Sequence, residues 1–324
     1  MSLRVLNPGI HSLLVDAGRP SSRGLGIPVG GPADRWSLAL GNALVGNPPF
    51  TVALEITLTG PTLAADADVG LCVFGAPFRI DRDGEPVEPG NTFTLRNGQT
   101  LHIGGTPMGC RAYLCVPGGF GAPDVLGSRT GLELVKAGEV LECASSSLPG
   151  RSLIEPIRSH KLPVCGSASE RGDIGNVCGD ELLNPQAGSL CLRALPGPQA
   201  DWFDDAFFTH AYRVSPASNR MGVRFDGPPL AFEKRELVSE PVAPGAVQIT
   251  NDGRPIVLGV DGQTIGGYPK VAHVLSADLD VLGQLRPGDV VRFKRATEEE
   301  AEAAAARRRD LLKKWLRRIA AAIA

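Results

Sequence analysis

The segment VDGQTIGGYPK, Val260 to Lys270, gathers an amide, a hydroxyl, a phenol and an amine around glycines. A glycine-rich loop cradles phosphates when a Lys and then a Ser or Thr follow its last glycine. Here Tyr268 and Pro269 follow, and Pro269 lacks an N–H and disfavours a helix start. The segment does not predict a phosphate loop. It favours close approach of a planar amide-like ligand, with a plain surface turn as the alternative.

Other polar clusters stand in glycine- and proline-rich surroundings. They contain Asp16, Arg19, Asp34 and Arg35; Gln199, Asp201 and Trp202; and Ser218, Asn219 and Arg220. The Asp–Arg pairs are more typical of turns or structural ion pairs than of catalysts, Asn219 is typical of a turn, and Trp202 is expected in a core. The guanidinium of Arg220 nevertheless offers a planar fork suited to a carboxylate.

Known catalytic and metal-binding motifs are missing from the sequence. It contains no Ser-His-Asp order or G-x-S-x-G elbow. Its seven cysteines never form a C-x-x-C pair, and its five histidines are isolated. We therefore expect no metal site and interpret the cysteines as buried thiols. A catalyst of this kind would orient and polarise amide or carboxyl groups, with donors such as Arg220 at a developing oxyanion.

The elements that position these residues are expected to be mostly β-strands. The chain has 324 residues, 40 glycines and 27 prolines, and short apolar runs alternate between turns. A net charge of -2 gives no electrostatic case for nucleic acid. We find no signal region and no apolar run near the roughly 20 residues of a membrane helix. The expected location is therefore cytoplasmic.

Landmarks along the chain indicate a duplication. GPTL, DGEPV and LRNGQTL recur in the same order as GPPL, DGRPIV and LRPGDVV, which favours two related β domains, with coincidence as the alternative. The second copy is longer by the segment with the glycine loop, and function tends to be added at such insertions. PADRWSLALGNALVG predicts an internal helix between Pro32 and Gly46.

The segment from residue 297 onward predicts a helix with a capping box, Thr297 to Glu300. Its apolar stripe is expected to dock on its own domain or on a second copy, which would make a homo-oligomer; a membrane surface or a partner is the alternative. The stripe consists of Leu311, Leu312, Trp315, Leu316 and Ile319.

Several long stretches in series resemble the KipI-antagonist family, also called the allophanate hydrolase subunit 2-like family or the family of the 5-oxoprolinase C subunit. They include DAGRP, GIPVGGPADR, ALEITLTGPTL, VLGSRT, LPGPQADWF, SNRMGVRFDGPPL and DGQTIGGYPK. The resemblance implies two cyclophilin-like β-barrel domains with few helices. We place the first domain at residues 1–185, with an N-terminal helix region, the second at 186–296, with the glycine loop, and the C-terminal helix at 297–324.

The resemblance also implies partners and an activity. A KipI-like B component and a LamB/YcsF-like A component would join this chain as the C component, and together they would hydrolyse 5-oxoproline to glutamate with ATP. In relatives of urea carboxylase type, the same fold moves a carboxyl group from carboxybiotin to urea. This chain has no biotinyl-lysine motif and no P-loop, so biotin would arrive on a separate carrier, and the position of ATP is open.

Candidate site residues are carried over where this sequence matches the family motifs. The catalytic candidates are Asn219, Arg220, Glu240, Gln263, Thr264, Tyr268 and Lys270. The substrate-binding candidates are Asp16, Arg19, Asp34, Glu55, Arg129, Gln199, Asp201, Gln248, Gly266 and Gly267.

The sequence departs from the family pattern at Val15, Pro241 and Ile265, and in the segment after Thr130. Each lost ligand hydrogen bond would weaken binding by roughly 0.5 to 1.5 kcal/mol, so the substrate could be a different small amide or lactam. Two further readings stay open. One is a non-catalytic protein that binds a KipI-like inhibitor of a sensor kinase, and the other is a scaffold that holds a partner through the C-terminal helix.

Overall fold

The computed structural model describes residues 1–150, 183–184, 189–232 and 235–323. The chain divides into two compact units. Unit 1 comprises Met1–Gly18, Gly30–Ala168 and Leu312–Ala324, and unit 2 comprises Arg19–Val29 and Ser169–Leu311. The predicted domain limit between residues 185 and 186 lies outside the described residues.

Unit 1 is built from two antiparallel sheets. The six-stranded sheet has the order β11 (Val140–Glu142), β1 (Ser2–Asn7), β4 (Thr62–Ala65), β9 (Thr100–Ile103), β6 (Ile80–Arg82), β7 (Glu85–Val87). The five-stranded sheet has the order β2 (His11–Val15), β3 (Ala53–Thr57), β10 (Arg111–Cys115), β5 (Val69–Gly75), β8 (Thr92–Leu95).

One hydrophobic core joins the two sheets of unit 1, because apolar residues of both belong to a single buried cluster. In β1, Leu3 and Val5 are fully buried while Arg4 is exposed, as expected for a strand with one face on the core. Similar buried side chains come from β3 of the other sheet, at Leu54 and Ile56. The core therefore lies between the sheets.

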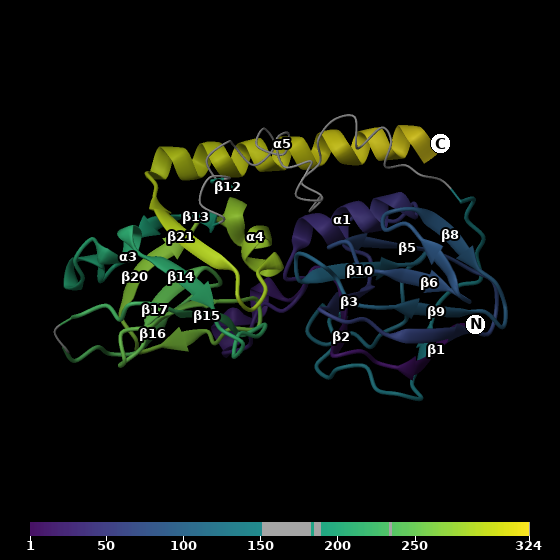
Figure 1. The fold of residues 1–324 in the computed structure, drawn as a ribbon, viewed down its shortest axis with the longest axis horizontal. Helices are drawn as coiled ribbons and strands as arrows, with labels where there is room; N and C mark the ends of the chain where they lie inside the picture. Colours follow the sequence, from purple (N-terminus) through teal and green to yellow (C-terminus); the bar gives the residue numbers. More distant parts are fainter. Residues whose placement is uncertain (151–182, 185–188, 233–234, 324) are drawn as a thin grey trace. The chain divides into compact units, whose positions relative to one another are not determined.

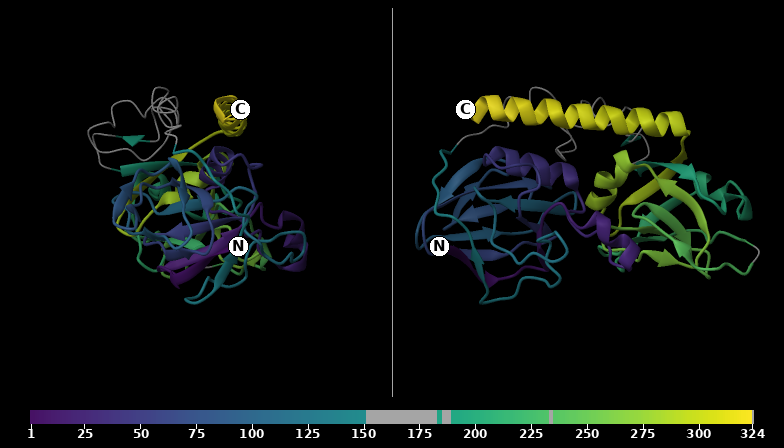
Figure 2. Two further views of the ribbon diagram at one scale, coloured as in Figure 1. Left: turned by 90° about the vertical axis from the view of Figure 1, so that its right-hand side faces the viewer. Right: turned by 180° about the vertical axis from the view of Figure 1, so that it is seen from behind.

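Helix α1 (Arg35–Leu44) covers strands β5 and β10 of unit 1 (Figures 1 and 2). It begins where the sequence predicts it, because Asp34 is its N-cap and accepts a hydrogen bond from the Ser37 N–H at 2.9 Å. Its residues from Trp36 to Leu44 are buried.

Unit 2 contains a closed barrel of seven strands. Their order is β13 (Ser189–Pro196), β20 (Lys270–Val274), β17 (Ala246–Ile249), β18 (Pro255–Leu258), β15 (Gly222–Asp226), β14 (Ala211–Val214), β21 (Val290–Arg295). Parallel pairing of β13 with β21 closes the ring, and β12 (Leu183–Asn184) pairs with β13 at its side.

The barrel interior is aromatic. Phe207, Tyr212, Phe225 and Phe293 are almost fully buried, and the rings of Phe207 and Phe293 stack with centroids 4.6 Å apart. Trp202 is partly buried against the same core, as predicted. Short helices complete the unit: η1 (Pro20–Leu25), η3 (Ala200–Trp202), α3 (Ala206–Thr209), η4 (Ser276–Asp278) and α4 (Leu279–Gln284).

The C-terminal helix α5 (Glu298–Ile323) is one uninterrupted helix in Figure 2. Its predicted capping box is confirmed: Thr297 N–H donates to Glu300 Oε2 at 2.9 Å, and Glu300 N–H donates to Thr297 Oγ1 at 3.3 Å. Trp315 and Ile319 of the predicted stripe are each 2% exposed. The other three stripe residues, Leu311, Leu312 and Leu316, are only partly buried.

The predicted fold class, mostly β with few helices and a C-terminal helix, is confirmed. Of the two expected barrels, unit 2 forms a closed ring of seven strands, and the strands described for unit 1 form two sheets around one core. The short apolar runs expected to form strands between turns do so, for example in β5, β8, β10, β18 and β21. Among the described residues, no helix has both the length and the apolar character needed to cross a bilayer.

Candidate functional site

A two-stranded ribbon in unit 2 carries part of the glycine loop. Its strands β16 (Glu240–Pro241) and β19 (Ile265–Gly266) pair with each other and form a sheet separate from the barrel. Glu240 lies opposite Gly266, and the Val242 N–H donates to the carbonyl of Thr264 at 2.9 Å. The ribbon thus brings Glu240 to the glycine loop from a distant point in the sequence.

The barrel presents an amide and an amine side by side. Gln248 on β17 and Lys270 on β20 are directly opposite residues of an antiparallel pair, and such side chains lie on the same face with their Cβ atoms about 5 Å apart. Gln248 is 2% exposed and Lys270 is 5% exposed. The β-strand register therefore places two polar groups in a nearly buried position.

Gln199 connects the barrel to the ribbon. Gly197 allows its loop to approach β20 closely, since a Cβ there would lie 2.2 Å from the carbonyl oxygen of Lys270. Gln199 Oε1 then accepts the Lys270 N–H at 2.9 Å, and Gln199 Nε2 donates to Glu240 Oε1 at 3.1 Å. Both ends of this amide are used, so Gln199 fixes the position of the Glu240 carboxylate.

Glu240 and Lys270 form an ion pair, with 2.5 Å between Oε1 and Nζ. The ammonium lies near the carboxylate but makes no hydrogen bond of good geometry with any described residue. The Lys270 ammonium, helped by the Gln199 amide and opposed by partial burial, holds the pKa of Glu240 below its ordinary value. Glu240 is therefore an anion, with 39% of its side chain exposed against 6% for Lys270.

Gly266 makes room for two amide nitrogens. A Cβ at this position would lie 2.3 Å from Gln248 Nε2 and 2.9 Å from Gln263 Nε2. The Gln248 nitrogen is buried and has no hydrogen-bond partner in the described part of the chain. We call Gln199, Glu240, Gln248, Gly266 and Lys270 the Lys270 cluster. Its donors suit the oxygen of an amide or a carboxylate.

The remaining loop residues separate into buried and exposed positions. Thr264 is 8% exposed, whereas Tyr268 is 38% exposed and Ile265 is 57% exposed. Gln263 and Gly267 are also exposed. The loop thus turns Gln263, Ile265 and Tyr268 toward solvent, where a ligand could contact them.

Arg220 and Asn219 hold the start of the loop. The Arg220 guanidinium is bidentate to Asp261, with Nε to Oδ2 at 2.6 Å and Nη2 to Oδ1 at 3.0 Å. Asn219 Oδ1 accepts the Met221 N–H at 2.9 Å, which is the turn geometry predicted for it. The structure gives both residues a clear supporting role, and their predicted catalytic roles stay predictions.

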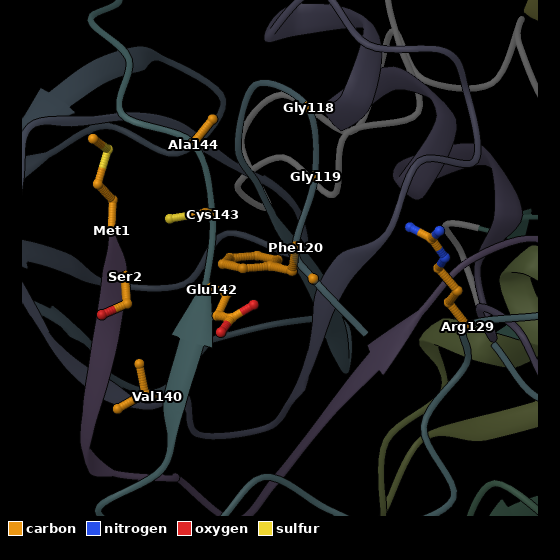
Figure 3. Close-up of a pocket in the computed structure, with 11 residues that line it drawn as sticks. Met1, Ser2, Gly118, Gly119, Phe120, Arg129, Val140, Glu142, Cys143 and Ala144 are labelled. Atoms are coloured by element: carbon orange, nitrogen blue, oxygen red, sulfur yellow. The ribbon is translucent and has the colours of Figure 1, made fainter. Parts of the chain in front are cut away.

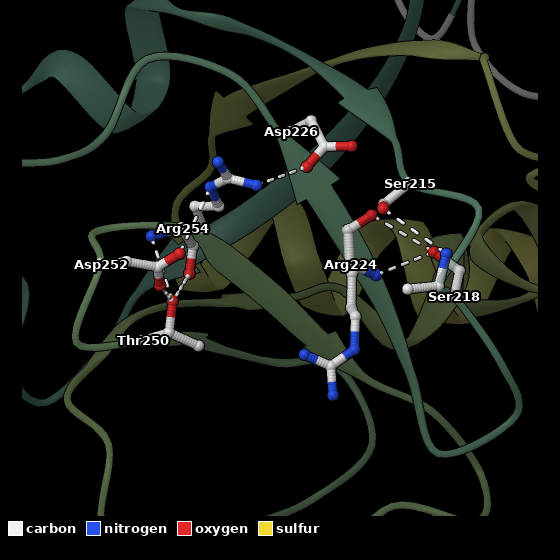
Figure 4. Close-up of polar contacts among 8 residues, drawn as sticks. Ser215, Ser218, Arg224, Asp226, Thr250, Asp252 and Arg254 are labelled. Atoms are coloured by element: carbon white, nitrogen blue, oxygen red, sulfur yellow. Dashed lines mark hydrogen bonds and ion pairs between the residues drawn. The ribbon is translucent and has the colours of Figure 1, made fainter.

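Side-chain contacts on the neighbouring strands brace this turn (Figure 4). Ser218 Oγ accepts the Arg224 N–H at 3.0 Å. Arg254 pairs with Asp226 at 3.0 Å and contacts Asp252 at 3.3 Å. These exposed contacts fix β15 and the β17–β18 turn rather than form a ligand site.

Asp16 anchors a loop of unit 1. Its carboxylate accepts hydrogen bonds from Ser128 Oγ at 2.5 Å, Arg129 N–H at 2.7 Å, Thr130 Oγ1 at 2.8 Å and Gly18 N–H at 2.9 Å. Partial burial opposes ionisation, but these donors outweigh it and lower the pKa of Asp16. The hydrogen bonds to the Asp16 carboxylate therefore come from the protein itself, three of them from residues 128–130.

Glu55 and Asp34 belong to a buried network in unit 1. Glu55 is fully buried, and its Oε2 accepts from Tyr113 Oη at 2.8 Å and Ala33 N–H at 2.9 Å. Arg111 Nε lies 3.5 Å from Glu55 Oε1. Burial, reinforced by the Glu55 charge, raises the pKa of Tyr113. These contacts fix the entry to α1.

The remaining candidates are Arg19, Asp201 and Arg129. Arg19 is 5% exposed at the start of a segment of unit 2, and Asp201 is exposed in η3. Arg129 lines a depression of about 600 Å³ in unit 1 with Glu142 and Cys143, although Figure 3 shows its side chain well away from theirs. Within the described ranges, His, Cys, Asp and Glu form no group that could hold a metal ion.

Comparison with known proteins decides the family. Residues 25–295 match the carboxyltransferase domain, subdomain A and B. The chain belongs to this carboxyltransferase family. Its curated relatives include the C subunit of 5-oxoprolinase from Escherichia coli strain K12, which is 34% identical over 304 residues, 92% of this chain and 93% of that protein. The same-named protein of Haemophilus influenzae is 31% identical over 97% of both chains.

A solved structure has the same fold as this chain. The crystal structure of Kluyveromyces lactis urea carboxylase has a TM-score of 0.78 and 26% identity to this chain. It covers 97% of this chain, which spans only 29% of that much longer protein. The resemblance inferred from the motifs is therefore confirmed at the level of the family.

Several supporting residues are absent from the sequence-based predictions. Asp261 holds Arg220, Ser128 and Thr130 hold Asp16, and Tyr113 and Arg111 hold Glu55. Asp261 stands two positions before Gln263 in the glycine loop, so an acid inside a predicted site loop was the available signal. The partners of Asp16 lie in the VLGSRT motif, more than 100 residues further along the chain, and those of Glu55 lie on β10. These pairings are not visible in the local sequence.

Proposed function

We propose that this chain is the C component of a 5-oxoprolinase-like complex, which uses ATP to hydrolyse 5-oxoproline or a related small amide or lactam. The observation that carries the proposal is a pair of buried donors. Gln248 Nε2 makes no hydrogen bond within the described residues, and Lys270 Nζ lies 2.5 Å from Glu240 Oε1 without good hydrogen-bond geometry. Near full-length similarity to two 5-oxoprolinase C subunits supports this choice of reaction.

The amide nitrogens of Gln248 and Gln263 both lie against Gly266, where they can donate to a lactam carbonyl oxygen. Negative charge develops on that oxygen when water adds to the carbonyl carbon, and donors already in place stabilise it. The ring C–N bond then breaks, and the nitrogen leaves as an amine after gaining a proton. Lys270 supplies positive charge beside this position.

The activity requires partners in this proposal. A KipI-like B component and a LamB/YcsF-like A component complete the complex, and the chain alone does not turn over substrate. ATP belongs to the assembled complex. The loop from Val260 to Lys270 does not fit its phosphates, because Tyr268 and Pro269 follow its last glycine and Pro269 has no N–H.

A second candidate is carboxyl transfer in a urea carboxylase-like system, which the structural similarity to urea carboxylase favours. Biotin on a separate carrier protein fits the donor set, since Lys270 and Gln248 could hold an oxygen of its carboxylated ring. When bound, that group would carry the transferred carboxyl group. The residues of this chain would bind and orient it.

The test is an ATP-consumption assay on this chain purified together with its KipI-like and LamB/YcsF-like partners. We expect release of ADP that depends on 5-oxoproline and stops when this chain is omitted. The double variant Gln263→Ala/Tyr268→Phe should abolish turnover and keep the circular dichroism spectrum. Turnover with urea and bicarbonate in the presence of a biotin carrier would favour the second candidate. A stable complex with the KipI-like protein and no turnover on any amide would favour a KipI-binding antagonist.

A further inference from the structure

In the Lys270 cluster, the carboxylate of Glu240 contacts the side chains of Lys270 and Gln199. We propose that the cluster binds the carboxylate of a small-molecule substrate, and that Glu240 occupies this place in the free protein until the substrate displaces it. The inference rests on the proposed function and names the substrate class: an amide or lactam that also bears a carboxylate.

The first observation is that the donors of the cluster are not satisfied by Glu240. Lys270 Nζ lies 2.5 Å from Glu240 Oε1, yet it makes no hydrogen bond of good geometry in the described structure, and neither does Gln248 Nε2. Buried donors without partners are unfavourable. An ammonium carries several N–H donors, so the pair is better suited to a ligand that reaches deeper than Glu240 does.

The second observation concerns where the two halves of the ion pair come from. Lys270 and Gln248 stand on paired strands of the closed barrel and are almost completely buried. Glu240 stands on the short ribbon outside the barrel, and its side chain is 39% exposed. The Lys270 ammonium is therefore held in place by the barrel, whereas the Glu240 carboxylate already reaches solvent.

Exchange of one carboxylate for another keeps the charges balanced. Removing Glu240 alone would leave a buried ammonium unpaired, which is strongly unfavourable. A substrate carboxylate replaces that charge while Glu240 moves fully into water. A neutral amide cannot make the exchange. The cluster therefore selects 5-oxoproline, which has a carboxylate, over 2-pyrrolidinone and urea, which have none.

Titration calorimetry on the purified full-length chain tests this without partners or ATP. Because Glu240→Gln removes the internal competitor, we expect it to bind 5-oxoproline about tenfold more tightly than the wild type. Lys270→Met should weaken that binding at least tenfold. Neither variant should gain affinity for 2-pyrrolidinone. Glu236→Gln is the matched control: it makes the same change on an exposed residue of the same segment and should leave affinity unchanged.

Unchanged or weaker binding of 5-oxoproline by Glu240→Gln, relative to Glu236→Gln, overturns the inference, as does the absence of binding in every variant. If Glu240→Gln does not fold, Glu240→Asp is the second variant. It shortens the side chain by one methylene and should also increase the affinity for 5-oxoproline. Failures of the two proposals are distinguishable. Turnover by the complex without the Glu240 effect rejects only the site, and the Glu240 effect without turnover rejects only the function.

Discussion

Gln248 and Lys270 face each other across strands β17 and β20 and are almost completely buried. In the described structure Gln248 Nε2 makes no hydrogen bond, and Lys270 Nζ lies 2.5 Å from Glu240 Oε1 without good hydrogen-bond geometry. Unsatisfied buried donors lower the free energy of unfolding. Their presence in a well-packed barrel indicates a position kept for binding rather than for stability. Stability and binding should therefore respond in opposite directions to substitution here.

Gln248→Met should raise the free energy of unfolding by about 1 kcal/mol, because a side chain of similar shape removes the buried donor without a partner. The same variant should lose binding of 5-oxoproline. Urea denaturation of the isolated chain measures the first effect. Gln199→Met is the comparison: both ends of its amide are hydrogen-bonded, so it should lower the free energy of unfolding by about 1 to 3 kcal/mol. An equal decrease in the free energy of unfolding in both variants would contradict this assignment.

Gly266→Ala should displace the Gln248 amide, because the new Cβ would lie 2.3 Å from Gln248 Nε2. Overpacking of this kind costs about 1 to 3 kcal/mol, and we expect at least a tenfold loss of substrate affinity. Gly267→Ala is the matched control, since its Cβ would meet only Ser239 Oγ, at 3.1 Å. Calorimetry on both variants separates them. Similar affinities for the two would rule out a role for the space at Gly266.

Asp16→Asn should lower the free energy of unfolding at pH 7 by about 2 kcal/mol, because it removes a charged acceptor that serves four donors. The pKa of Asp16 is depressed in the folded state, so its contribution is present above 3.8 and is lost as the pH falls through the folded value. Urea denaturation at both pH values measures this. The difference in the free energy of unfolding between variant and wild type should be smaller below pH 3.8 than at pH 7. Asp124→Asn, at an exposed position of the same loop, should change stability little at either pH.

His273 on β20 should make the protein less stable in mild acid. Burial, opposed by a contact with the Val274 carbonyl, lowers its pKa from 6.5. Between the folded and unfolded values the unfolded chain binds more protons, so stability falls as the pH drops below about 6.5. His273→Gln should flatten this part of the profile, and His102→Gln, on an exposed residue of β9, should not. If the free energy of unfolding of the wild type were constant from pH 7 to pH 5, the assignment would be contradicted.

Elements with local signals could be predicted from the sequence. Helix α1 lies between Pro32 and Gly46, as expected, with Asp34 as its cap, and the predicted capping box of α5 joins Thr297 to Glu300. Both depend on residues a few positions apart, and that proximity is visible in a sequence. The same holds for the Asn219 turn, which closes on Met221.

The geometry of the candidate site could not be predicted in this way. Gln199, Glu240 and Lys270 were each proposed from family motifs, but their contacts join residues that are distant in sequence. Only the barrel register places Gln248 opposite Lys270. Pairing across strands depends on the whole sheet, and so the partners of a site residue emerge only with the fold.

Because seven strands close the barrel through β13 and β21, the ribbon of β16 and β19 adds no pairing to that ring. Changes at Pro241 or Ile265 can therefore accumulate over evolutionary time with little effect on folding of the barrel. Selection could retune ligand preference there while the inherited fold persists. The ribbon is then the place where members of this lineage would be expected to diverge first.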